Sequence, residues 1–418
     1  MRSGIDSEIL CFYNRKGIAV CLLVLLTWTM ACSQKIQQSA NSSRGLQNEM
    51  ATAPVLKTGA DQTELWLPML LGRKVAVAAN PTSVIARTHI VDSMLALGVN
   101  LGCVFAPEHG FRGEAEAGES VVGGIDKKSG VKVISLYGDH KKPTSSDLNG
   151  IDIIVFDIQD VGVRFYTYIS TLQYLMEAAA LYGIPLVVLD RPNPHGNYLD
   201  GPVLDKKFSS FVGMQPIPVV YGMTIGEYAS MLNGEEWLEK SVKCELTVVR
   251  MQHWNHDADY TLPIPPSPNL PNAESVRLYP SLCFFEGTVV SVGRGTAMPF
   301  QCFGYPGFLA GDFKFTPMSI PGKAKEPPFM GRECIGNDLR GFFKSTRPDK
   351  LELEWLISAY LKYPVKSEFF NPFFEKLAGT DRLRNQIEQG WSAAKIRESW
   401  QAEIAEFKKT RSKYLLYP

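Results

Sequence analysis

Four acidic residues follow closely after short apolar runs in the N-terminal half of the chain. They are Glu108 after LGCVFA, Asp157 and Asp160 after IDIIVF, and Asp190 after PLVVL. Such runs are typical of buried parallel strands, and in open parallel sheets ligands bind beyond the carboxyl ends of the strands. Because acid/base hydrolysis requires positioned carboxyl groups, we expect catalytic carboxylates among these four residues.

Glu108 has the surroundings that point most directly to catalysis. It lies in the segment PEHGFRG (107–113), where a proline and two glycines shape the backbone. His109 follows it in the same loop, so both side chains can face one ligand. We therefore expect Glu108 and His109 to take part in catalysis.

The three aspartates also have structural interpretations. Asp190 precedes Arg191 and can pair with it or cap a turn, and Asp157 can fix a loop by accepting backbone N–H bonds. Their position after strands still predicts that Asp157, Asp160 or Asp190 is a second catalytic carboxylate.

Arginines and aromatic residues accompany the acids. Arginine binds carboxylates through two parallel hydrogen bonds, so one arginine can hold an acidic group of a substrate, whereas the others are internal ion-pair partners. The arginines in strand-end loops or glycine-bounded turns are Arg112, Arg164, Arg191 and Arg294. Aromatic rings can stack on the apolar face of a sugar, although most of the phenylalanines are expected in the core. The aromatic residues of these loops are Phe111, Phe165, Tyr166, Tyr168, Tyr221, Phe284, Phe285 and Phe300.

The sequence gives little support for a metal site, a serine nucleophile or a nucleic-acid surface. His253 and His256 are the closest histidines, but they lack the helical H-E-x-x-H frame of a zinc site. The chain contains no G-x-S-x-G for a serine nucleophile. With 43 basic and 43 acidic residues the net charge is zero, which argues against a nucleic-acid surface. We expect neither a metal nor a cofactor.

Strands and helices alternate in the part of the chain that carries these residues. The expected strands are Lys74–Ala79, Leu101–Ala106, Val131–Leu136, Ile151–Phe156 and Pro185–Leu189, and the expected helices are His89–Leu97 and Thr171–Tyr182. This pattern predicts an α/β fold, a Rossmann-like doubly wound parallel sheet, over residues 55–260. No G-x-G-x-x-G follows the first strand, so no dinucleotide is indicated.

The sequence changes character after Thr261. Pro263–Pro271 (PIPPSPNLP) is proline-dense and predicts a linker or a surface loop. Thr288–Val292 favours a strand, and Leu351–Leu361 and Ala394–Lys408 favour helices. We therefore expect a smaller α+β C-terminal domain over residues 261–418 that completes the active-site cleft.

The N-terminal residues indicate export. Arg15 and Lys16 precede a short apolar run, which is typical of a signal peptide over residues 1–31. Thr29-Met30-Ala31-Cys32 is similar to a lipobox, which predicts a lipid anchor at Cys32, a flexible tether over residues 32–54 and a periplasmic location. The alternative is a plain signal peptide with a chance cysteine.

Five cysteines remain in the body of the chain: Cys103, Cys244, Cys283, Cys302 and Cys334. They show no metal-binding spacing, so buried free thiols are expected. If one disulfide forms in an oxidising compartment, Cys283 with Cys302 is the expected pair.

Several segments together resemble the NamZ-type exo-β-N-acetylmuramidases. The matching segments are NPTS (80–83), PEHGFRG (107–113), FDIQDVGVRFYTY (156–168), LDRPNPHG (189–196), PVVYGMTIGE (218–227), PNLP (268–271) and EGTVVSVGRG (286–295). The resemblance implies a Rossmann-like catalytic domain, a smaller C-terminal domain, and release of N-acetylmuramic acid from the non-reducing end of peptidoglycan fragments. His195 and Asn197 depart from the Gly-Gly expected after Pro194, which bears on the shape of that loop.

The resemblance supports Glu108, which matches the acid of the E-H-G element. If none of the three aspartates lies near Glu108, Glu286 is the next candidate for a second acid, because it follows the aromatic pair Phe284-Phe285. Arg164 or Arg191 is the expected holder of the lactyl carboxylate of the sugar. The full set of expected substrate-binding residues is Asn80, Arg112, Arg164, Tyr166, Arg191, Asn193, Tyr221, Glu286 and Arg294.

Two other classes of protein remain open at this point. A periplasmic lipoprotein that binds peptidoglycan or sugars without catalysis would also need arginines and aromatic residues. A nucleotide-dependent enzyme on a Rossmann-like fold is the second, against which the missing glycine motif argues. The sequence makes no prediction about the oligomeric state.

Overall fold

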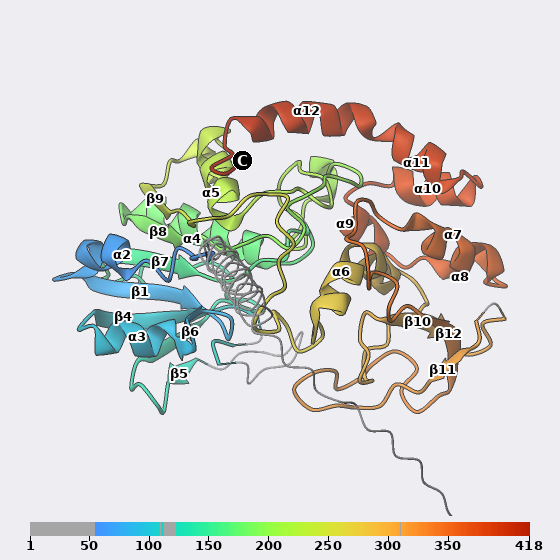
Figure 1. Cartoon of the computed structure of the whole chain (residues 1–418), viewed down its shortest axis with the longest axis horizontal. Coiled ribbons are helices and arrows are strands. Elements are labelled where there is room, and N and C mark those ends of the chain that lie inside the picture. Colours follow the sequence, from blue (N-terminus) through green and yellow to red (C-terminus); the bar gives the residue numbers. More distant parts are fainter. Residues whose placement is uncertain (1–54, 109, 113–122, 310) are drawn as a thin grey trace, which may run out of the picture. The chain divides into compact units, whose positions relative to one another are not determined.

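A seven-stranded sheet organises the N-terminal half of the described chain (Figure 1). Its order is β5-β6-β4-β1-β7-β8-β9, and the short edge strand β5 runs antiparallel to β6, whereas the other neighbours are parallel. Counted along the chain, the six parallel strands have the order 3-2-1-4-5-6 of a Rossmann fold, which confirms the expected fold class. The strands are β1 (Lys74–Ala79), β4 (Asn100–Ala106), β5 (Gly124–Ile125), β6 (Lys132–Ser135), β7 (Ile153–Asp157), β8 (Leu186–Leu189) and β9 (Leu246–Val249).

Alternating side chains of the sheet enter two separate cores, as β1 illustrates. Val75 and Val77 pack in one apolar cluster, and Ala76 and Ala78 pack in the other. Because successive side chains of a strand point to opposite faces, both faces of the sheet must be covered. This double burial explains why the strands read as continuous apolar runs.

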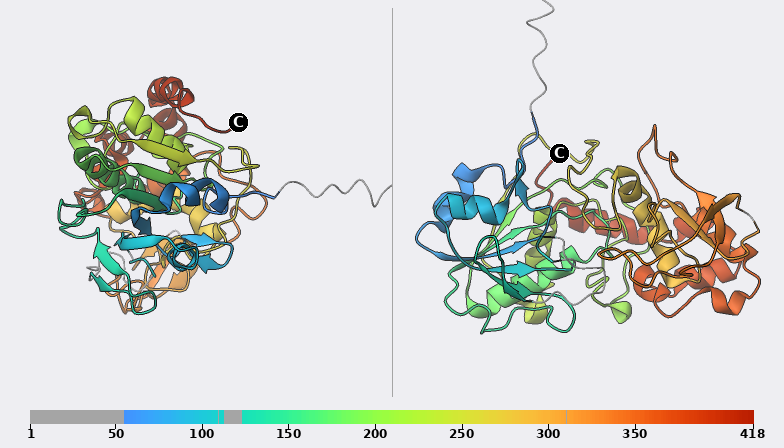
Figure 2. Two further views of the ribbon diagram at one scale, coloured as in Figure 1. Left: turned by 90° about the vertical axis from the view of Figure 1, so that its left-hand side faces the viewer. Right: turned by 90° about the horizontal axis from the view of Figure 1, so that it is seen from below.

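Helices cover both faces of the sheet (Figure 2). On one face lie α2 (Thr63–Leu70) and α3 (Ile90–Ala96), and on the other lie α4 (Tyr168–Tyr182) and α5 (Ile225–Gly234). The N-terminus of α4 follows the loop after β7, so it lies at the carboxyl edge of the sheet. The remaining small elements of this half are β2 (Val84–Ile85), β3 (Thr88–His89), η1 (Lys206–Phe208) and η2 (Glu239–Ser241).

The C-terminal part combines a small antiparallel sheet with helices. The sheet has the order β10-β12-β11, formed by β10 (Cys302–Tyr305), β11 (Phe313–Phe315) and β12 (Cys334–Asp338). The helices are α6 (Ala273–Leu282), η3 (Cys283–Gly287), α7 (Leu353–Lys362), α8 (Lys366–Phe369), α9 (Phe374–Ala378), α10 (Arg382–Glu388), α11 (Ala393–Ser399) and α12 (Gln401–Ser412). The boundary expected between residues 260 and 261 stays a prediction.

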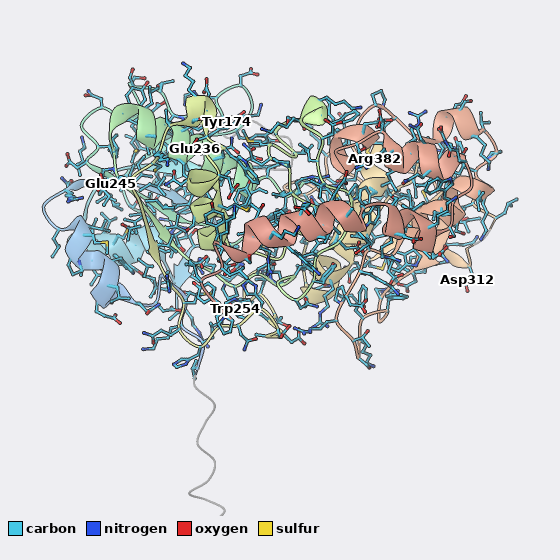
Figure 3. The ribbon with its side chains drawn as sticks, turned by 90° about the horizontal axis from the view of Figure 1, so that it is seen from above. Tyr174, Glu236, Glu245, Trp254, Asp312 and Arg382 are labelled. Atoms are coloured by element: carbon cyan, nitrogen blue, oxygen red, sulfur yellow. The ribbon has the colours of Figure 1, made fainter. Side chains whose placement is uncertain are left out.

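The end of the chain returns to the N-terminal half. Figure 3 shows α12 running from the C-terminal helices toward α5. Beyond it, the Leu416 N–H donates to the Glu227 carboxylate of α5 at 2.8 Å. The Tyr417 hydroxyl donates to Asp190, just after β8, at 2.6 Å. The C-terminal residues therefore help to hold one side of the sheet.

Three local expectations were wrong. Thr288–Val292 forms isolated bridges to Phe370 and Gly304 rather than a strand. The helix expected over Ala394–Lys408 is two helices that meet at Trp400. Pro263–Pro271 is not merely a linker or surface loop, because Ser267, Asn269 and Leu270 are buried.

The described cysteines are free and buried, as the sequence indicated. Cys283 and Cys302 are not joined, so the pairing suggested for them is not present.

The structure describes residues 55–108, 110–112, 123–309 and 311–418. The predicted signal peptide, the tether with Cys32, and His109 lie outside these residues. Within them, no helix has the length and apolar character needed to span a membrane.

Candidate active site

The carboxyl edge of the sheet carries the four acids that the sequence singled out. Glu108 lies just beyond β4, Asp157 ends β7, Asp160 lies in the loop after β7, and Asp190 lies just beyond β8. The strand order reverses between β1 and β7, which is where ligands of open α/β sheets usually bind. The topology therefore brings all four acids to one edge, but their surroundings differ.

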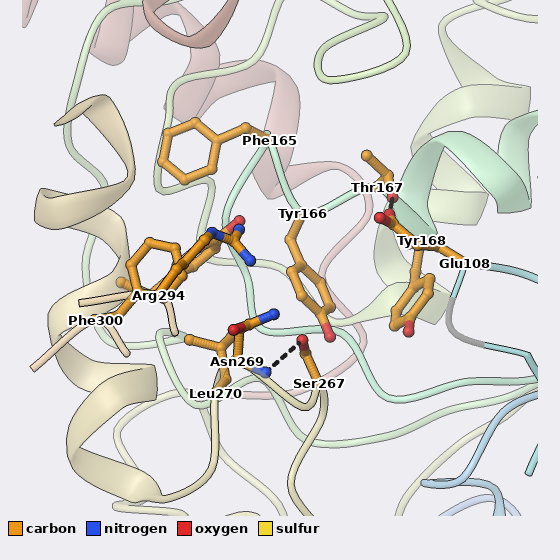
Figure 4. A pocket seen from close by; sticks show the side chains of 11 residues that line it. Glu108, Phe165, Tyr166, Thr167, Tyr168, Ser267, Asn269, Leu270, Arg294 and Phe300 are labelled. Atoms are coloured by element: carbon orange, nitrogen blue, oxygen red, sulfur yellow. Dashed lines mark hydrogen bonds between the residues drawn. The ribbon is translucent and has the colours of Figure 1, made fainter. Parts of the chain in front are cut away.

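A pocket opens at this edge between the sheet and the C-terminal part (Figure 4). Its walls come from the loop after β4, the start of α4, the proline-dense segment, α6 and the loop before β10. The lining residues are Glu108, Phe165, Tyr166, Thr167, Tyr168, Ser267, Asn269, Leu270, Tyr279, Arg294 and Phe300. Of these, Glu108 carries the one carboxylate and Arg294 the one positive charge. The pocket thus combines aromatic walls with two opposite charges.

Glu108 is the acid that reaches the pocket. Its side chain is half-buried, and it accepts hydrogen bonds from the Tyr137 hydroxyl at 3.1 Å and from the Thr167 hydroxyl at 3.3 Å. Figure 4 shows Glu108 and Thr167 pointing toward each other beside Tyr168. Burial, followed by the charge of Glu108, raises the pKa of the Tyr168 phenol above its usual value. A carboxyl group in this setting can donate or accept a proton at a bound ligand.

Asp157 is fully engaged in an ion pair beneath the surface. Arg191 binds both of its carboxylate oxygens, through Nε at 2.6 Å and Nη2 at 2.9 Å. The Arg191 guanidinium also donates to the Val84 carbonyl at 3.0 Å. Both side chains are buried and neither lines the pocket. The structure therefore places this pair inside the protein rather than in the pocket.

Asp190 joins three segments of the chain. Its carboxylate accepts from the Thr224 hydroxyl at 2.7 Å, from the Gly226 N–H at 2.8 Å and from the Tyr417 hydroxyl at 2.6 Å. Burial raises the pKa of Asp190 to about 6. These donors come from the start of α5 and from the end of the chain, so Asp190 ties both to the sheet and does not line the pocket.

Asp160 is buried next to the pocket residues but does not line the pocket. One oxygen accepts from the Gly162 N–H at 2.6 Å and from the Tyr221 hydroxyl in a short hydrogen bond. The other oxygen, Oδ1, has no hydrogen-bond partner among the described residues. Burial raises the pKa of Asp160 to about 6, because no cation offsets the loss of solvent.

Three of the four expected arginines are occupied elsewhere. Arg112 pairs with Asp92 at 3.1 Å and with Asp126 at 2.8 Å. Arg164 is fully buried, and its guanidinium donates to four backbone carbonyls, those of Pro202, Ile217, Leu377 and Ala378. Arg191 holds Asp157. The structure brings only Arg294 of this set into the pocket.

The other residues expected to bind substrate also fall into two groups, those that line the pocket and those that have partners elsewhere. Tyr166 lines the pocket and donates from its hydroxyl to the Pro266 carbonyl at 2.6 Å. Asn193 is buried, with its amide donating to the Met223 carbonyl at 2.9 Å, and Tyr221 is occupied by Asp160. Asn80 is buried beside Thr82, and its Nδ2 has no hydrogen-bond partner within the described chain. Glu286 does not line the pocket but pairs with Arg294.

Sequence reasoning missed several residues that line the pocket or contact Glu108. Thr167 and Tyr137 hold Glu108, and Ser267, Asn269 and Tyr279 come from the C-terminal side of the pocket. The matching segments FDIQDVGVRFYTY (156–168) and PNLP (268–271) include Thr167 and Asn269, but no pattern in the sequence marks Tyr137, Ser267 or Tyr279 as site residues.

Comparison with known proteins gives a consistent result. The model of the N-terminal domain of exo-beta-N-acetylmuramidase NamZ matches residues 75–274, and the model of its C-terminal domain matches residues 277–417. The peptidoglycan beta-N-acetylmuramidase NamZ of Bacillus subtilis is 41% identical over 408 residues, which cover 91% of this chain and 95% of that protein.

Two crystal structures of DUF1343 family proteins from Bacteroides fragilis are also similar. The first has a TM-score of 0.80 and 44% identity, and the second has a TM-score of 0.74 and 30% identity. Each comparison covers 87% of this chain and 99% of the other chain.

Proposed function

The chain belongs to the exo-β-N-acetylmuramidase NamZ family, and we propose that Glu108 is the acid/base with which it releases N-acetylmuramic acid from the non-reducing end of peptidoglycan fragments. The chain is accordingly a glycoside hydrolase. Cleavage of a glycosidic bond requires a carboxyl group that protonates the leaving oxygen or activates water. The single observation that carries the proposal is the position of Glu108 in the pocket, where two hydroxyl groups orient its carboxyl group.

The aromatic walls of the pocket suit a sugar. Phe165, Tyr166, Tyr279 and Phe300 line it, and the flat faces of such rings pack against the C–H faces of pyranose rings. Hydroxyl and amide groups of Ser267 and Asn269 add polar contacts. A pocket of this composition binds a carbohydrate unit rather than an extended apolar ligand.

The other sheet-edge acids have different roles in this proposal. The contacts of Asp157 and Asp190 support structural roles, because each carboxylate already has an arginine or several donors from the protein. Asp160 is buried, does not line the pocket and accepts a hydrogen bond from Tyr221. Glu286 is paired with Arg294, so its contacts support a positioning role.

The proposal is tested with a chromogenic N-acetylmuraminide and with glycan strands free of peptides. We expect chromophore release from the first and free N-acetylmuramic acid as the first product of the second. Appearance of larger oligosaccharides at the start would contradict exo-action. Tight binding of the glycan without any hydrolysis would support the non-catalytic binding protein instead.

We also propose that the chain is exported and anchored by a lipid at Cys32. The basic and apolar residues before Cys32 and the polar tether after it support this proposal. An anchor would hold the enzyme beside the polymer that it degrades. Replacement of Cys32 by Ala should move the protein from the membrane fraction to the soluble periplasmic fraction, and unchanged fractionation would contradict the proposal.

A further inference from the structure

We propose that Arg294 binds the lactyl carboxylate of the substrate and thereby distinguishes N-acetylmuramic acid from N-acetylglucosamine. This inference rests on the proposed function, because it assigns a residue to the acidic group that only the first of these sugars carries. Glu286 and Phe300 act as positioning residues that hold the arginine in place.

The guanidinium group of Arg294 has a partner on one edge and another on one face. Its Nε donates to Glu286 Oε1 at 2.5 Å, and its guanidinium carbon lies 5.0 Å from the centroid of the Phe300 ring. Burial lowers the pKa of Arg294, but the charge and the hydrogen bond of Glu286 together outweigh this effect and raise it, so the side chain keeps its positive charge. A guanidinium held at Nε and against a ring cannot easily turn away from the pocket.

The other edge of the guanidinium faces the pocket. Neither Nη1 nor Nη2 donates to any acceptor within the part of the chain that the structure describes, although the side chain is only 23% exposed. Figure 4 shows the guanidinium of Arg294 within the pocket, near Tyr166. Two parallel N–H groups at this edge match the two oxygens of a carboxylate, which makes the contact bidentate.

The other arginines considered for this role have partners inside the protein and do not line the pocket. Asp92 and Asp126 occupy the guanidinium of Arg112. Both terminal nitrogens of Arg164 donate to carbonyl groups and the residue lies outside the pocket, and Arg191 is bound to Asp157. We therefore propose Arg294, in place of the expected Arg164 or Arg191, as the residue that holds the lactyl group.

The positions of Arg294 and Glu108 also give the sugar an orientation. Figure 4 shows the two side chains on opposite sides of Tyr166. The lactyl group is attached to C3 of the ring, whereas the scissile bond starts at C1. A sugar whose carboxylate reaches Arg294 therefore presents its glycosidic oxygen toward the Glu108 side. N-acetylglucosamine has no lactyl carboxylate, so it would not make this contact and the guanidinium edge of Arg294 would remain without a partner.

The test uses two chromogenic substrates that differ in one charge: an N-acetylmuraminide and the same glycoside with its lactyl carboxyl group converted to the neutral amide. We expect the wild-type enzyme to lose about 10- to 100-fold in kcat/KM on the neutral substrate, which is the range for a charge-assisted hydrogen bond. In Arg294→Met the two substrates should differ by less than about threefold, because the partner of the charge is gone. Arg294→Lys should fall between these values, since it keeps the charge but loses the fork.

Arg340→Met is the matched control. Arg340 also pairs with one carboxylate, Asp338, at 2.7 Å and also lies over one ring, Phe313, at 5.5 Å, but it does not line the pocket. It should keep the wild-type preference for the charged substrate. Glu286→Gln should raise KM for the charged substrate more than it lowers kcat, because it loosens the hold on Arg294 without touching the acid/base.

An unchanged preference for the charged substrate in Arg294→Met would overturn the inference while leaving the proposed function intact. If the wild-type enzyme hydrolyses neither substrate, the proposed function fails, and calorimetric binding of N-acetylmuramic acid and its lactyl amide then tests Arg294 separately. Equal affinity of the wild type for these two sugars would also overturn the inference. If Arg294→Met does not fold, the Arg294→Lys variant and the wild-type binding data decide.

Discussion

Glu108 and Asp157 both stand at the carboxyl edge of the sheet, but their partners differ. Asp157 is completely buried and is bound through both oxygens by Arg191, whereas Glu108 is half-buried, faces the pocket and accepts from two neutral hydroxyl groups. A carboxylate that already has a cation is poorly suited to exchange protons. Topology therefore selects which acids come together, and their partners decide which of them can act.

The same contrast separates two arginines. Arg164 donates to four backbone carbonyls from two distant parts of the chain, and it fixes the fold where they meet. Arg294 has one carboxylate partner and a free edge in the pocket. In each comparison one residue is held by partners inside the protein, whereas the other lines the pocket.

The largest effect on stability is expected from Asp157→Asn. It leaves the buried Arg191 without its counter-charge, which should reduce the free energy of unfolding by about 3–5 kcal/mol. Urea denaturation followed by tryptophan fluorescence measures this loss. A change below about 1 kcal/mol would mean that the pair is not a structural one and would remove the contrast with Glu108.

A smaller, pH-dependent effect is expected from Asp160→Asn. The pKa of Asp160 is raised from 3.8 to about 6 in the folded protein, so its stabilising contribution is present below about pH 4 and is lost as the pH rises through 6. The free energy of unfolding of the wild type should therefore fall relative to that of the variant between pH 4 and 6, by up to about 3 kcal/mol. Parallel pH profiles of the two proteins would show that Asp160 does not titrate as the structure indicates.

The smallest of these effects is expected from Tyr417→Phe. The change removes the hydroxyl group that donates to Asp190 and accepts from the Met251 N–H, which should cost about 1–2 kcal/mol of stability. Because Asp190 holds the end of the chain rather than the substrate, kcat should stay within about twofold of the wild type. A loss of kcat beyond about 10²-fold, as for an acid/base, would place Asp190 in the chemistry.

The sequence was sufficient to predict the sheet because each of its central strands is buried on both faces. Such burial leaves a continuous apolar run, as in the first four residues of β7 (Ile153–Asp157). The acid that follows this run marks the carboxyl edge of the sheet. The short edge strand β5 and the strand β9 were not predicted. Both residues of β5 are exposed, and in β9 the exposed Thr247 interrupts the apolar run, so the apolar signal is weaker in both strands.

The roles of individual residues were harder to predict, because they depend on contacts between distant parts of the chain. Arg164 donates to the carbonyls of Leu377 and Ala378, which lie more than 200 residues away in the sequence. Ser267 and Asn269 belong to a proline-dense segment that resembles a linker, but Pro266 accepts a hydrogen bond from Tyr166 and the segment becomes a pocket wall. Neither arrangement leaves a local pattern in the sequence.

The most direct test of the account is the activity of Glu108→Gln on a chromogenic N-acetylmuraminide. The matched control is Glu235→Gln, because Glu235 is also a partly buried glutamate that accepts from a tyrosine hydroxyl, that of Tyr414 at 2.7 Å, but lies outside the pocket. We predict that Glu108→Gln loses about 10²–10⁴-fold in kcat with an unchanged thermal midpoint, whereas Glu235→Gln keeps wild-type activity. Turnover by folded Glu108→Gln at close to the wild-type rate would contradict the assignment of Glu108 as the acid/base.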